Sequence, residues 1–349
     1  MRKLKVAIIG HFGGKEDLLD GQTVKTKILY EELSALTDWR IKKVDTYYKK
    51  RNPAKLLLQT IATLISTRRI IVLLSGNGMK FYFPLLNFAG KFFRTRVYHD
   101  VIGGNLDVYI KQNPKLLKYL NNFSVNWVET NQLKKCVESC GVKNCEVIPN
   151  FKRLAILPES AIDTKEKMPF RFCTFSRVMK EKGIEDAIAA VGKINSEVGE
   201  TVCTLDIYGL IDKGYKERFS EVMSTVAPCV QYKGIVPFDK SVEAIKDYAA
   251  LLFPTTWDGE GFPGTIVDAY SAGLPVIATD WNSNPEIIAE GKTGFIYPHE
   301  DKDGLALSMK KFMGYDASAR IAMKKNCLTA AKEYVPQKWI GIIKKQIEK

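Results

Sequence analysis

Short apolar runs alternate with amphipathic segments along the whole chain, and this pattern predicts strands separated by helices. In the first half, the apolar runs predict strands at residues 5–10, 41–45, 70–75, 97–99, 124–129 and 145–148. In the second half, they predict strands at residues 170–176, 204–208, 230–233, 249–253, 276–279 and 294–296. Such alternation is typical of doubly wound α/β domains, and two series of strands indicate two of them.

A stretch without periodicity separates the two series. Residues 153–169 contain Pro158, Ser160, Asp163 and a Lys-Glu-Lys cluster, which break any regular pattern. We therefore expect an N-terminal Rossmann-like domain over residues 1–152, a linker over 153–169 and a C-terminal Rossmann-like domain over 170–335. Residues 336–349 carry apolar side chains at helical spacing, which predicts a final helix.

The composition of the 349 residues excludes several classes of protein. A hydrophobic content of 46% excludes general disorder. No apolar run approaches the roughly eighteen residues of a membrane span, and the start of the chain fits a first strand better than a secretion signal. The seven cysteines are odd in number and scattered, which argues against a disulfide framework. We therefore expect a cytoplasmic protein.

The net charge of +13 is distributed unequally between the two halves. Residues 1–150 hold 25 Lys and Arg against 12 Asp and Glu, whereas residues 151–349 hold 27 of each kind. The whole excess of positive charge therefore lies in the first half. This asymmetry predicts an anionic partner for one domain only.

Two carboxylates, Glu260 and Asp268, lie eight residues apart across a glycine-rich turn. The pattern predicts a buried strand that ends at Phe253, a tight loop over 260–264 and a helix over 265–272. Free N–H groups and the positive end of the helix dipole then form a site for a phosphate. The carboxylates would bind hydroxyls on either side of it, as in a sugar-nucleotide site.

These residues and those around them resemble the retaining glycosyltransferases of the GT-B fold, of the family-4 type. The similarity covers residues 260–276, with the small-Gly-x-Pro-Val strand at 272–276, and continues through 284–288 and 291–295. A second matching motif, FSRVMKEKG, occupies residues 175–183. Two residues depart from the family pattern, since Asp268 replaces Glu and Pro263 replaces a glycine, which removes one N–H from the loop.

The resemblance implies a GT-B fold, in which two Rossmann-like domains face a central cleft and the last helix returns to the N-terminal domain. It assigns the diphosphate clamp to Arg177 and Lys182, the donor sugar hydroxyls to Glu260, and the ribose to Asp268. The alternatives give these residues no ligand. Arg177 and Lys182 would then lie in a solvated turn, Glu260 would be a charged residue of a loop, and Asp268 would be an acidic residue that the helix dipole favours in the first turn. The remaining donor contacts are the phosphate-binding N–H groups of Gly264 and Thr265, and Phe262, which shapes the pocket.

Two features of the first domain correspond to further family positions. Gly13 and Gly14 follow the first strand, where family members place a glycine-rich loop near the donor phosphates. His99 ends a predicted strand at its carboxyl edge, where open α/β sheets bind ligands, and relatives direct a histidine there at the donor sugar. The alternatives are a tight turn without a ligand and a histidine that only caps its strand.

The resemblance also implies transfer with retention of configuration, in which the leaving phosphate oxygen takes the acceptor proton. We find no Asp-x-Asp motif, and the spacing of Cys136, Cys140 and Cys145 matches no common zinc pattern. We therefore expect transfer without a metal or another cofactor, with Arg177 and Lys182 in place of a cation. A covalent route would need a carboxylate at the anomeric carbon, and Asp100 is the only candidate in the first domain.

The basic half contains two segments that suit a membrane surface. Residues 42–55 hold six Lys and Arg against Asp45 alone, and an apolar helical stripe follows at 57–65. The next predicted helix is apolar and aromatic around much of its surface, with basic residues at its ends. The alternative buries both helices against the sheet and leaves the lysines as a solubilising face. No nucleic-acid motif accompanies the charge, so we expect an anionic membrane surface rather than nucleic acid as the partner.

The sequence therefore predicts a retaining glycosyltransferase that moves a sugar from a nucleoside diphosphate donor, UDP in preference to GDP, to a glycan acceptor. Family resemblance suggests a lipid-linked acceptor, bacterial-type cell-surface polysaccharide synthesis, and peripheral association with the inner face of the cell membrane. One alternative is a GT-B sugar-nucleotide epimerase. Another is a non-catalytic protein that binds membranes or anionic polymers through its basic half.

Overall fold

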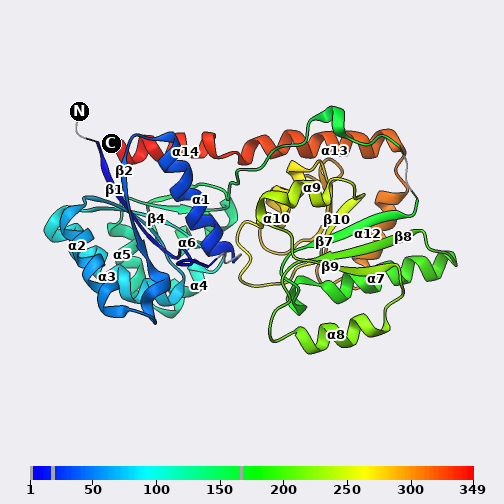
Figure 1. The fold of residues 1–349 in the computed structure, drawn as a ribbon, viewed down its shortest axis with the longest axis horizontal. Coiled ribbons are helices and arrows are strands. Elements are labelled where there is room, and N and C mark those ends of the chain that lie inside the picture. The colour runs from blue at the N-terminus through cyan, green and yellow to red at the C-terminus, as the bar shows by residue number, and fades with distance from the viewer. Residues whose placement is uncertain (1–2, 17–19, 166–167) are drawn as a thin grey trace. The chain divides into compact units, whose positions relative to one another are not determined.

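The computed structural model describes residues 3–16, 20–165 and 168–349, which divide into two compact units (Figure 1). Unit 1 comprises Met1–Arg153, Gly259–Phe262 and Val335–Lys349, and unit 2 comprises Leu154–Asp258 and Pro263–Tyr334. Of the predicted linker, residues 166 and 167 lie outside the described residues, and Glu159–Ala161 form the short helix η2. The predicted domain limits at residues 152 and 170 remain predictions. The short segment 259–262 belongs to unit 1, although both of its neighbours in sequence belong to unit 2.

Unit 1 is built on a parallel six-stranded sheet with the order β2-β1-β3-β4-β5-β6. Its strands are β1 (Lys5–Gly10), β2 (Arg40–Asp45), β3 (Arg69–Leu73), β4 (Arg96–Asp100), β5 (Val125–Val128) and β6 (Cys145–Val147). Because all strands are parallel, their carboxyl ends meet at one edge of the sheet. The strand order reverses between β1 and β3, and such a switch point is where open α/β sheets bind ligands.

Helices cover both faces of the unit 1 sheet. They are α1 (Gly21–Leu36), η1 (Thr46–Lys49), α2 (Pro53–Ser66), α3 (Gly76–Phe93), α4 (Leu106–Gln112), α5 (Lys115–Asn122), α6 (Asn131–Ser139) and α14 (Pro336–Glu348). Helix α14 packs against α1, while α2 contacts α3 and α3 contacts α5. The last helix is fixed to unit 1 by buried isoleucines and by two hydrogen bonds, since the Trp127 indole donates to Gln346 at 2.6 Å and Arg69 donates to the carbonyl of Ile347 at 2.7 Å.

Unit 2 is a second parallel sheet, with the order β12-β11-β10-β7-β8-β9. Its strands are β7 (Phe170–Phe175), β8 (Cys203–Tyr208), β9 (Val230–Gly234), β10 (Ala250–Phe253), β11 (Val276–Thr279) and β12 (Gly294–Tyr297). This is the strand order of dinucleotide-binding Rossmann domains, with the switch point between β7 and β10. The prediction of two Rossmann-like doubly wound domains is therefore confirmed.

The helices of unit 2 form two groups. They are η3 (Lys180–Lys182), α7 (Ile184–Val198), α8 (Lys216–Thr225), η4 (Phe238–Lys240), α9 (Ser241–Ile245), α10 (Gly264–Ser271), α11 (Asn284–Ile287), α12 (Gly304–Met313), α13 (Ala317–Ala331) and η5 (Lys332–Tyr334). Helix α7 packs against α12, and α10 packs against both α9 and α13. All seven cysteines are free. Within the described residues, no helix has both the length and the apolar character needed to cross a membrane.

Candidate functional site

The carboxyl ends of β7 and β10 bring together both motifs that the sequence singled out in unit 2. The hydroxyl of Thr265, at the start of α10, donates to the carbonyl of Phe175 at the end of β7, at 2.5 Å. The backbone N–H of Thr256, in the loop after β10, donates to the carbonyl of Glu181 at 2.8 Å. Residues 175–183 and the start of α10 therefore lie at the same edge of the sheet, at its switch point.

The turn that carries Lys182 lies directly on the loop after β10. Gly183 has φ of +67°, and a Cβ at this position would lie 2.2 Å from the carbonyl oxygen of Pro254. Any side chain would therefore push the turn away, and the left-handed backbone would strain it further. Only glycine allows this approach of the two segments.

The two predicted diphosphate ligands both lie near one tryptophan. The ammonium of Lys182 lies 4.7 Å from the ring centre of Trp257 and 5.3 Å from that of Phe253, and the side chain is buried. The guanidinium of Arg177 lies 6.0 Å from the Trp257 ring centre and is exposed. A cation held over aromatic faces keeps its charge in a site of low dielectric constant, where it attracts an anion more strongly than it would in water.

Helix α10 presents its N-terminus at this edge of the sheet. It begins at Gly264, and no side chain of its N-cap residue, Pro263, caps it. The positive end of the helix dipole therefore adds to the charges of the two cations. One turn further, Asp268 is buried, and its Oδ1 accepts a hydrogen bond from the hydroxyl of Ser241 at 2.8 Å. The predicted ribose contact of Asp268 stays a prediction.

Glu260 and Phe262, predicted as donor contacts, belong to unit 1 and not to the unit that holds Arg177 and Lys182. Their loop packs backbone to backbone on a pair of glycines, since a Cβ on Gly104 would lie 2.3 Å from the carbonyl oxygen of Glu260. The N–H of Phe262 donates to Oε2 of Glu129 at 3.0 Å. The position of this loop within unit 1 is thus fixed by main-chain contacts and by one buried carboxylate.

That carboxylate belongs to a buried cluster of three charges. The ammonium of Lys25, on α1, lies 2.6 Å from Asp100 and 2.9 Å from Glu129, and also donates to the carbonyl of Val101 at 2.9 Å. Burial raises the pKa of Asp100 to about 6, although the ammonium acts in the opposite direction. Burial also disfavours the charged form of Lys25, but the two carboxylates outweigh it and raise the pKa of the ammonium above its usual value.

His99 is a core residue in this structure. Its side chain is 0% exposed, lies edge-on to Phe83 and Phe123, and shares a 3.1 Å hydrogen bond with Asn126. Burial lowers its pKa to about 4, so the imidazole is neutral. Its Nε2 is buried and has no hydrogen-bond partner within the described residues, and the prediction that His99 is directed at a ligand stays a prediction. Consecutive strand residues point to opposite faces, and the next residue, Asp100, contacts Lys25.

The loop at Gly13 and Gly14 follows β1, as predicted, and both residues have positive φ. Two backbone N–H groups of this segment bind within the protein, since Phe12 and Gly14 each donate a hydrogen bond to the carboxylate of Asp45 at 2.9 Å. A Cβ on Gly14 would lie 2.7 Å from the ring of Tyr47. The Gly14 N–H is thus already used within the protein, and phosphate binding by this loop stays a prediction.

Sequence reasoning missed Trp257, Ser241 and the pair Lys25 and Glu129. A signal existed for Glu129, because Asp100 ends β4 and Glu129 directly follows β5, and the carboxyl ends of these neighbouring parallel strands meet. The other three residues, Trp257, Ser241 and Lys25, contact segments that are far away in the sequence, so no local pattern indicates their roles. Across the described residues, no group of three or more His, Cys, Asp or Glu side chains is arranged to hold a metal ion.

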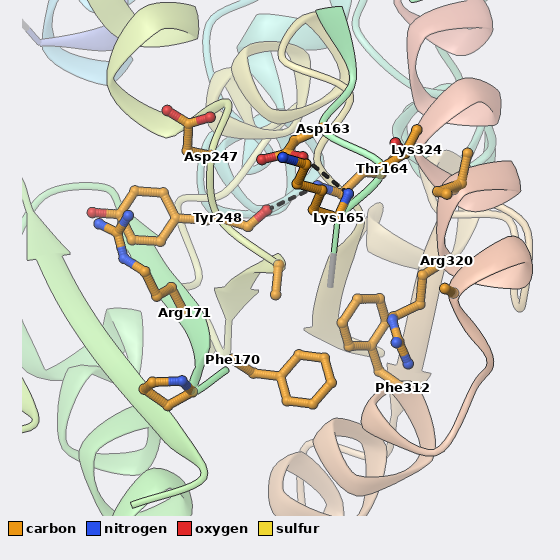
Figure 2. Close-up of a pocket in the computed structure, with 14 residues that line it drawn as sticks. Asp163, Thr164, Lys165, Phe170, Arg171, Asp247, Tyr248, Phe312, Arg320 and Lys324 are labelled. Carbon is orange, nitrogen blue, oxygen red and sulfur yellow. Dashed lines mark hydrogen bonds between the residues drawn. The ribbon is translucent and has the colours of Figure 1, made fainter. Parts of the chain in front are cut away.

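A hollow in unit 2 lies away from these residues, at the opposite edge of the sheet near the start of β7 (Figure 2). Its volume is about 90 Å³, well below the roughly 300–1,000 Å³ of ligand sites. Two of its cations are already engaged, because Arg171 pairs with Asp206 at 3.2 Å and Arg320 donates to the carbonyls of Met313 and Tyr315. We therefore assign this hollow a structural role.

The buried cluster around Lys25 generates a prediction about stability and pH. Lys25→Met leaves two buried carboxylates without a cation, which we expect to lower the free energy of unfolding by about 3–5 kcal/mol near neutral pH. The folded-state pKa of Asp100 is above its unfolded value and should rise further in the variant, so the loss should be largest at about pH 8 and smaller at about pH 5. Urea unfolding at both pH values measures this difference. The exposed Lys135→Met is the control, and an equal loss for Lys25→Met at both pH values would contradict the cluster.

Comparison with known proteins finds a family to which part of the chain is similar. Residues 169–314 match the family described as glycosyl transferases group 1. The chain is 26% identical over 164 residues to the amylovoran biosynthesis glycosyltransferase AmsK of Erwinia amylovora, a match that covers 45% of this chain and 40% of AmsK. It is 28% identical over 203 residues to the GtfA subunit of a UDP-N-acetylglucosamine–peptide N-acetylglucosaminyltransferase of Streptococcus pneumoniae, with 56% and 38% covered. The chain thus spans about two fifths of the length of these relatives.

Two solved structures share the fold over almost the entire chain. HepE of Anabaena, solved in complex with UDP and glucose, superposes with a TM-score of 0.74 at 14% identity, with 99% of each chain covered. A sucrose-phosphate synthase of Thermosynechococcus elongatus superposes with a TM-score of 0.74 at 15% identity, with 99% of this chain and 98% of that chain covered. The chain therefore has the GT-B fold, and its residues 169–314 are similar to the family of glycosyl transferases group 1.

Proposed function

We propose that the protein transfers a sugar from a nucleoside diphosphate donor to a glycan acceptor, with UDP preferred over GDP. The observation that carries this proposal is the convergence, at one sheet edge of unit 2, of Arg177, Lys182 and the N-terminus of α10. The names of similar proteins support it, since the GtfA subunit is named for a UDP-sugar and HepE was solved with UDP and glucose. AmsK, named for amylovoran biosynthesis, supports a role in polysaccharide synthesis.

The chemistry of the departing diphosphate explains why these groups suit the task. Negative charge grows on the diphosphate as the bond to the sugar breaks, and fixed cations stabilise it without reorganisation. Lys182 is held by its turn and by the faces of Trp257 and Phe253, so its position is set before the donor binds. We further propose that Asp268 binds the ribose and Glu260 the hydroxyls of the donor sugar, because a carboxylate accepts paired hydrogen bonds from a diol.

Retention of configuration and independence from metal are the finer parts of the proposal. In this scheme the acceptor oxygen forms the new bond to the anomeric carbon on the face from which the diphosphate leaves. The leaving phosphate oxygen takes the acceptor proton, so no protein base is needed. Arg177 and Lys182 take the part that a divalent cation plays in other transferases.

The affinity for UDP tests the proposed role of Lys182. Lys182→Ala should weaken UDP binding about tenfold to a hundredfold, because it removes a charged partner of the diphosphate. Lys180→Ala is the matched control, since Lys180 is an exposed lysine of the same turn. Isothermal titration with UDP, UDP-sugars and GDP-sugars measures both variants. If no nucleotide or nucleotide sugar binds the wild-type protein, the donor site is refuted.

The reaction itself is tested by its products. We expect UDP release from a UDP-sugar only when a glycan acceptor is present, a product with the anomeric configuration of the donor, and an unchanged rate in EDTA. A coupled UDP assay follows the release of UDP and the rate in EDTA, and NMR gives the anomeric configuration of the product. Conversion of the donor without an acceptor would point instead to an epimerase, and loss of the rate in EDTA would contradict metal-independent transfer.

Unit 1 carries an exposed apolar surface that suits a membrane. Large apolar side chains are exposed on α2 and α3, two helices that pack against each other (Figure 1). They are Leu57, Leu58, Ile61, Ile65, Phe81, Phe88 and Phe92. Basic residues flank them, and all of the net positive charge lies in the first 150 residues. We therefore propose that this surface docks on the anionic inner face of the cell membrane, where a lipid-linked acceptor would be found.

Vesicle flotation tests this docking surface. The protein should float with vesicles that contain phosphatidylglycerol, float less with pure phosphatidylcholine, and dissociate as salt screens the charges. Leu58→Asp with Phe92→Asp should reduce partitioning about tenfold or more, because 69% and 68% of these side chains are exposed and would enter the interface. Leu307→Asp, at an exposed leucine on α12 of unit 2, is the control. Equal flotation of the double variant and the wild type would exclude this surface.

A further inference from the structure

Segment 259–262, which carries Glu260, packs with its backbone directly on another loop of unit 1. A Cβ on Gly104 would lie 2.3 Å from the carbonyl oxygen of Glu260, and a Cβ on Gly261 would lie 3.0 Å from the carbonyl carbon of Gly103. These opposing atoms belong to the backbone, so they cannot rotate away as the end of a side chain can. Any side chain at position 104 would therefore displace the segment that carries Glu260.

The end of the segment is held by both polar backbone groups of Phe262. Its N–H donates to Oε2 of Glu129 at 3.0 Å, and its carbonyl oxygen accepts a hydrogen bond from the side-chain amide of Asn150 at 3.4 Å. Glu129 lies so close to the segment that a Cβ on Gly261 would be 2.4 Å from the same Oε2. The carboxylate of Glu129 is therefore in direct contact with the backbone on both sides of the peptide bond between residues 261 and 262.

Lys25 fixes the orientation of this carboxylate. The three protons of its ammonium are matched by three oxygens, which are those of Asp100 at 2.6 Å, Oε1 of Glu129 at 2.9 Å and the carbonyl of Val101 at 2.9 Å. Because Oε1 of Glu129 binds the ammonium, Oε2 faces the N–H of Phe262. Both Lys25 and Glu129 are buried, so water screens their attraction little. A cation on α1 thus determines where segment 259–262 lies.

A buried ionic cluster is a costly way to hold a loop if stability is all that it provides, because apolar residues of similar volume often stabilise as well or better. Charged hydrogen bonds add direction, since each one restricts both a distance and an angle. A group that binds a ligand needs this precision. Its placement has to be correct to about 0.5 Å, and an error of about 1 Å can cost about a hundredfold in rate.

From these observations we propose that Glu129 and Lys25 are positioning residues for Glu260. They hold the backbone of segment 259–262 so that the carboxylate of Glu260 meets the hydroxyls of the donor sugar, and neither of them contacts the donor. They thereby set how tightly the protein binds a UDP-sugar relative to UDP. This inference rests on the proposed function, and it names two residues on which the proposed role of Glu260 depends.

The ratio of the affinity for a UDP-sugar to the affinity for UDP tests this proposal. UDP, UDP-glucose and UDP-N-acetylglucosamine are titrated into the full chain by calorimetry, and the sugar that the wild type binds more tightly is used for the variants. Glu260→Ala should lower the ratio about tenfold to a hundredfold, because it removes a charged partner of the sugar hydroxyls. The affinity for UDP should stay unchanged, because Arg177, Lys182 and α10 belong to unit 2.

Two substitutions disturb the segment from different sides. Glu129→Met removes the acceptor of the Phe262 N–H, while Lys25 keeps Asp100 as its partner. Gly104→Ala pushes against the carbonyl oxygen of Glu260 and changes no charge. Each should lower the ratio about threefold to tenfold and leave the affinity for UDP unchanged, because each displaces the sugar contact without touching the diphosphate contacts.

Each substitution has a matched control. Glu31→Met removes an exposed carboxylate on α1, and Gly192→Ala adds a methyl group where no atom lies within 4 Å. Both should leave the ratio unchanged. Thermal unfolding of every variant shows whether it is folded, and Gly104→Ala carries the test by itself if Glu129→Met does not fold.

A double-mutant cycle separates positioning from general damage. In the Glu260→Ala background, Gly104→Ala should lower the ratio no further, because the contact through which it acts is already absent. Losses that multiply in the double variant would overturn the proposal. So would a loss of affinity for UDP as large as the loss of affinity for the UDP-sugar.

The same measurements distinguish this inference from the function on which it rests. If Glu260→Ala lowers the ratio whereas Glu129→Met and Gly104→Ala do not, the positioning role is refuted and the role of Glu260 stands. If Glu260→Ala leaves the ratio unchanged, the role of Glu260 is refuted and the positioning role with it. Only a wild-type protein that binds neither UDP nor a UDP-sugar refutes the transferase function as well.

Discussion

The candidate donor site depends on the close approach of Gly183 to the carbonyl oxygen of Pro254. A Cβ would lie 2.2 Å from that oxygen, so only glycine lets the 180–182 turn rest on the loop after β10. The contact places Lys182 over two aromatic rings and presents the carbonyl of Glu181 to the N–H of Thr256. Because the cation is held by the backbone, its position does not depend on a ligand. Such preorganisation is what electrostatic stabilisation of a leaving group requires.

Unit 1 uses charge in a different way, since its buried charges serve to position the backbone. Glu129 accepts from the ammonium of Lys25 through one oxygen and from the N–H of Phe262 through the other. A buried ion pair is weak evidence for stability, because desolvation offsets much of the attraction. Here the cluster has a specific structural consequence, which is to seat segment 259–262 on the glycines at 103 and 104. Glu260 is held in unit 1 by this backbone, whatever its side chain binds.

Most strands and both unit 2 motifs could be predicted from the sequence, because apolar periodicity and glycine spacing are local signals. Open α/β sheets bind ligands at the carboxyl ends of their strands, and this rule located the polar residues at those ends. It could not predict which of two consecutive side chains points toward a ligand. At β4 the imidazole of His99 packs on Phe83 and Phe123 while Asp100 contacts Lys25, and a ligand contact of His99 stays a prediction. The contact of Trp257 with Lys182 was not predictable, since no local pattern records it. Nor could the sequence show that segment 259–262 belongs to unit 1.

The two units carry their positive charges under different physical conditions. Lys182 is buried, so its field is little screened and its geometry is fixed, which suits a diphosphate that must leave along one direction. Lys49 and Lys50 are exposed, and salt limits their reach to about 8 Å at physiological ionic strength. Flexible exposed ammonium groups can follow a phosphate whose position varies, as it does on a lipid surface. The concentration of net positive charge in unit 1 therefore fits the proposed docking on an anionic surface, whereas unit 2, in which acidic residues outnumber basic ones, would bind its proposed diphosphate through the fixed placement of a few groups.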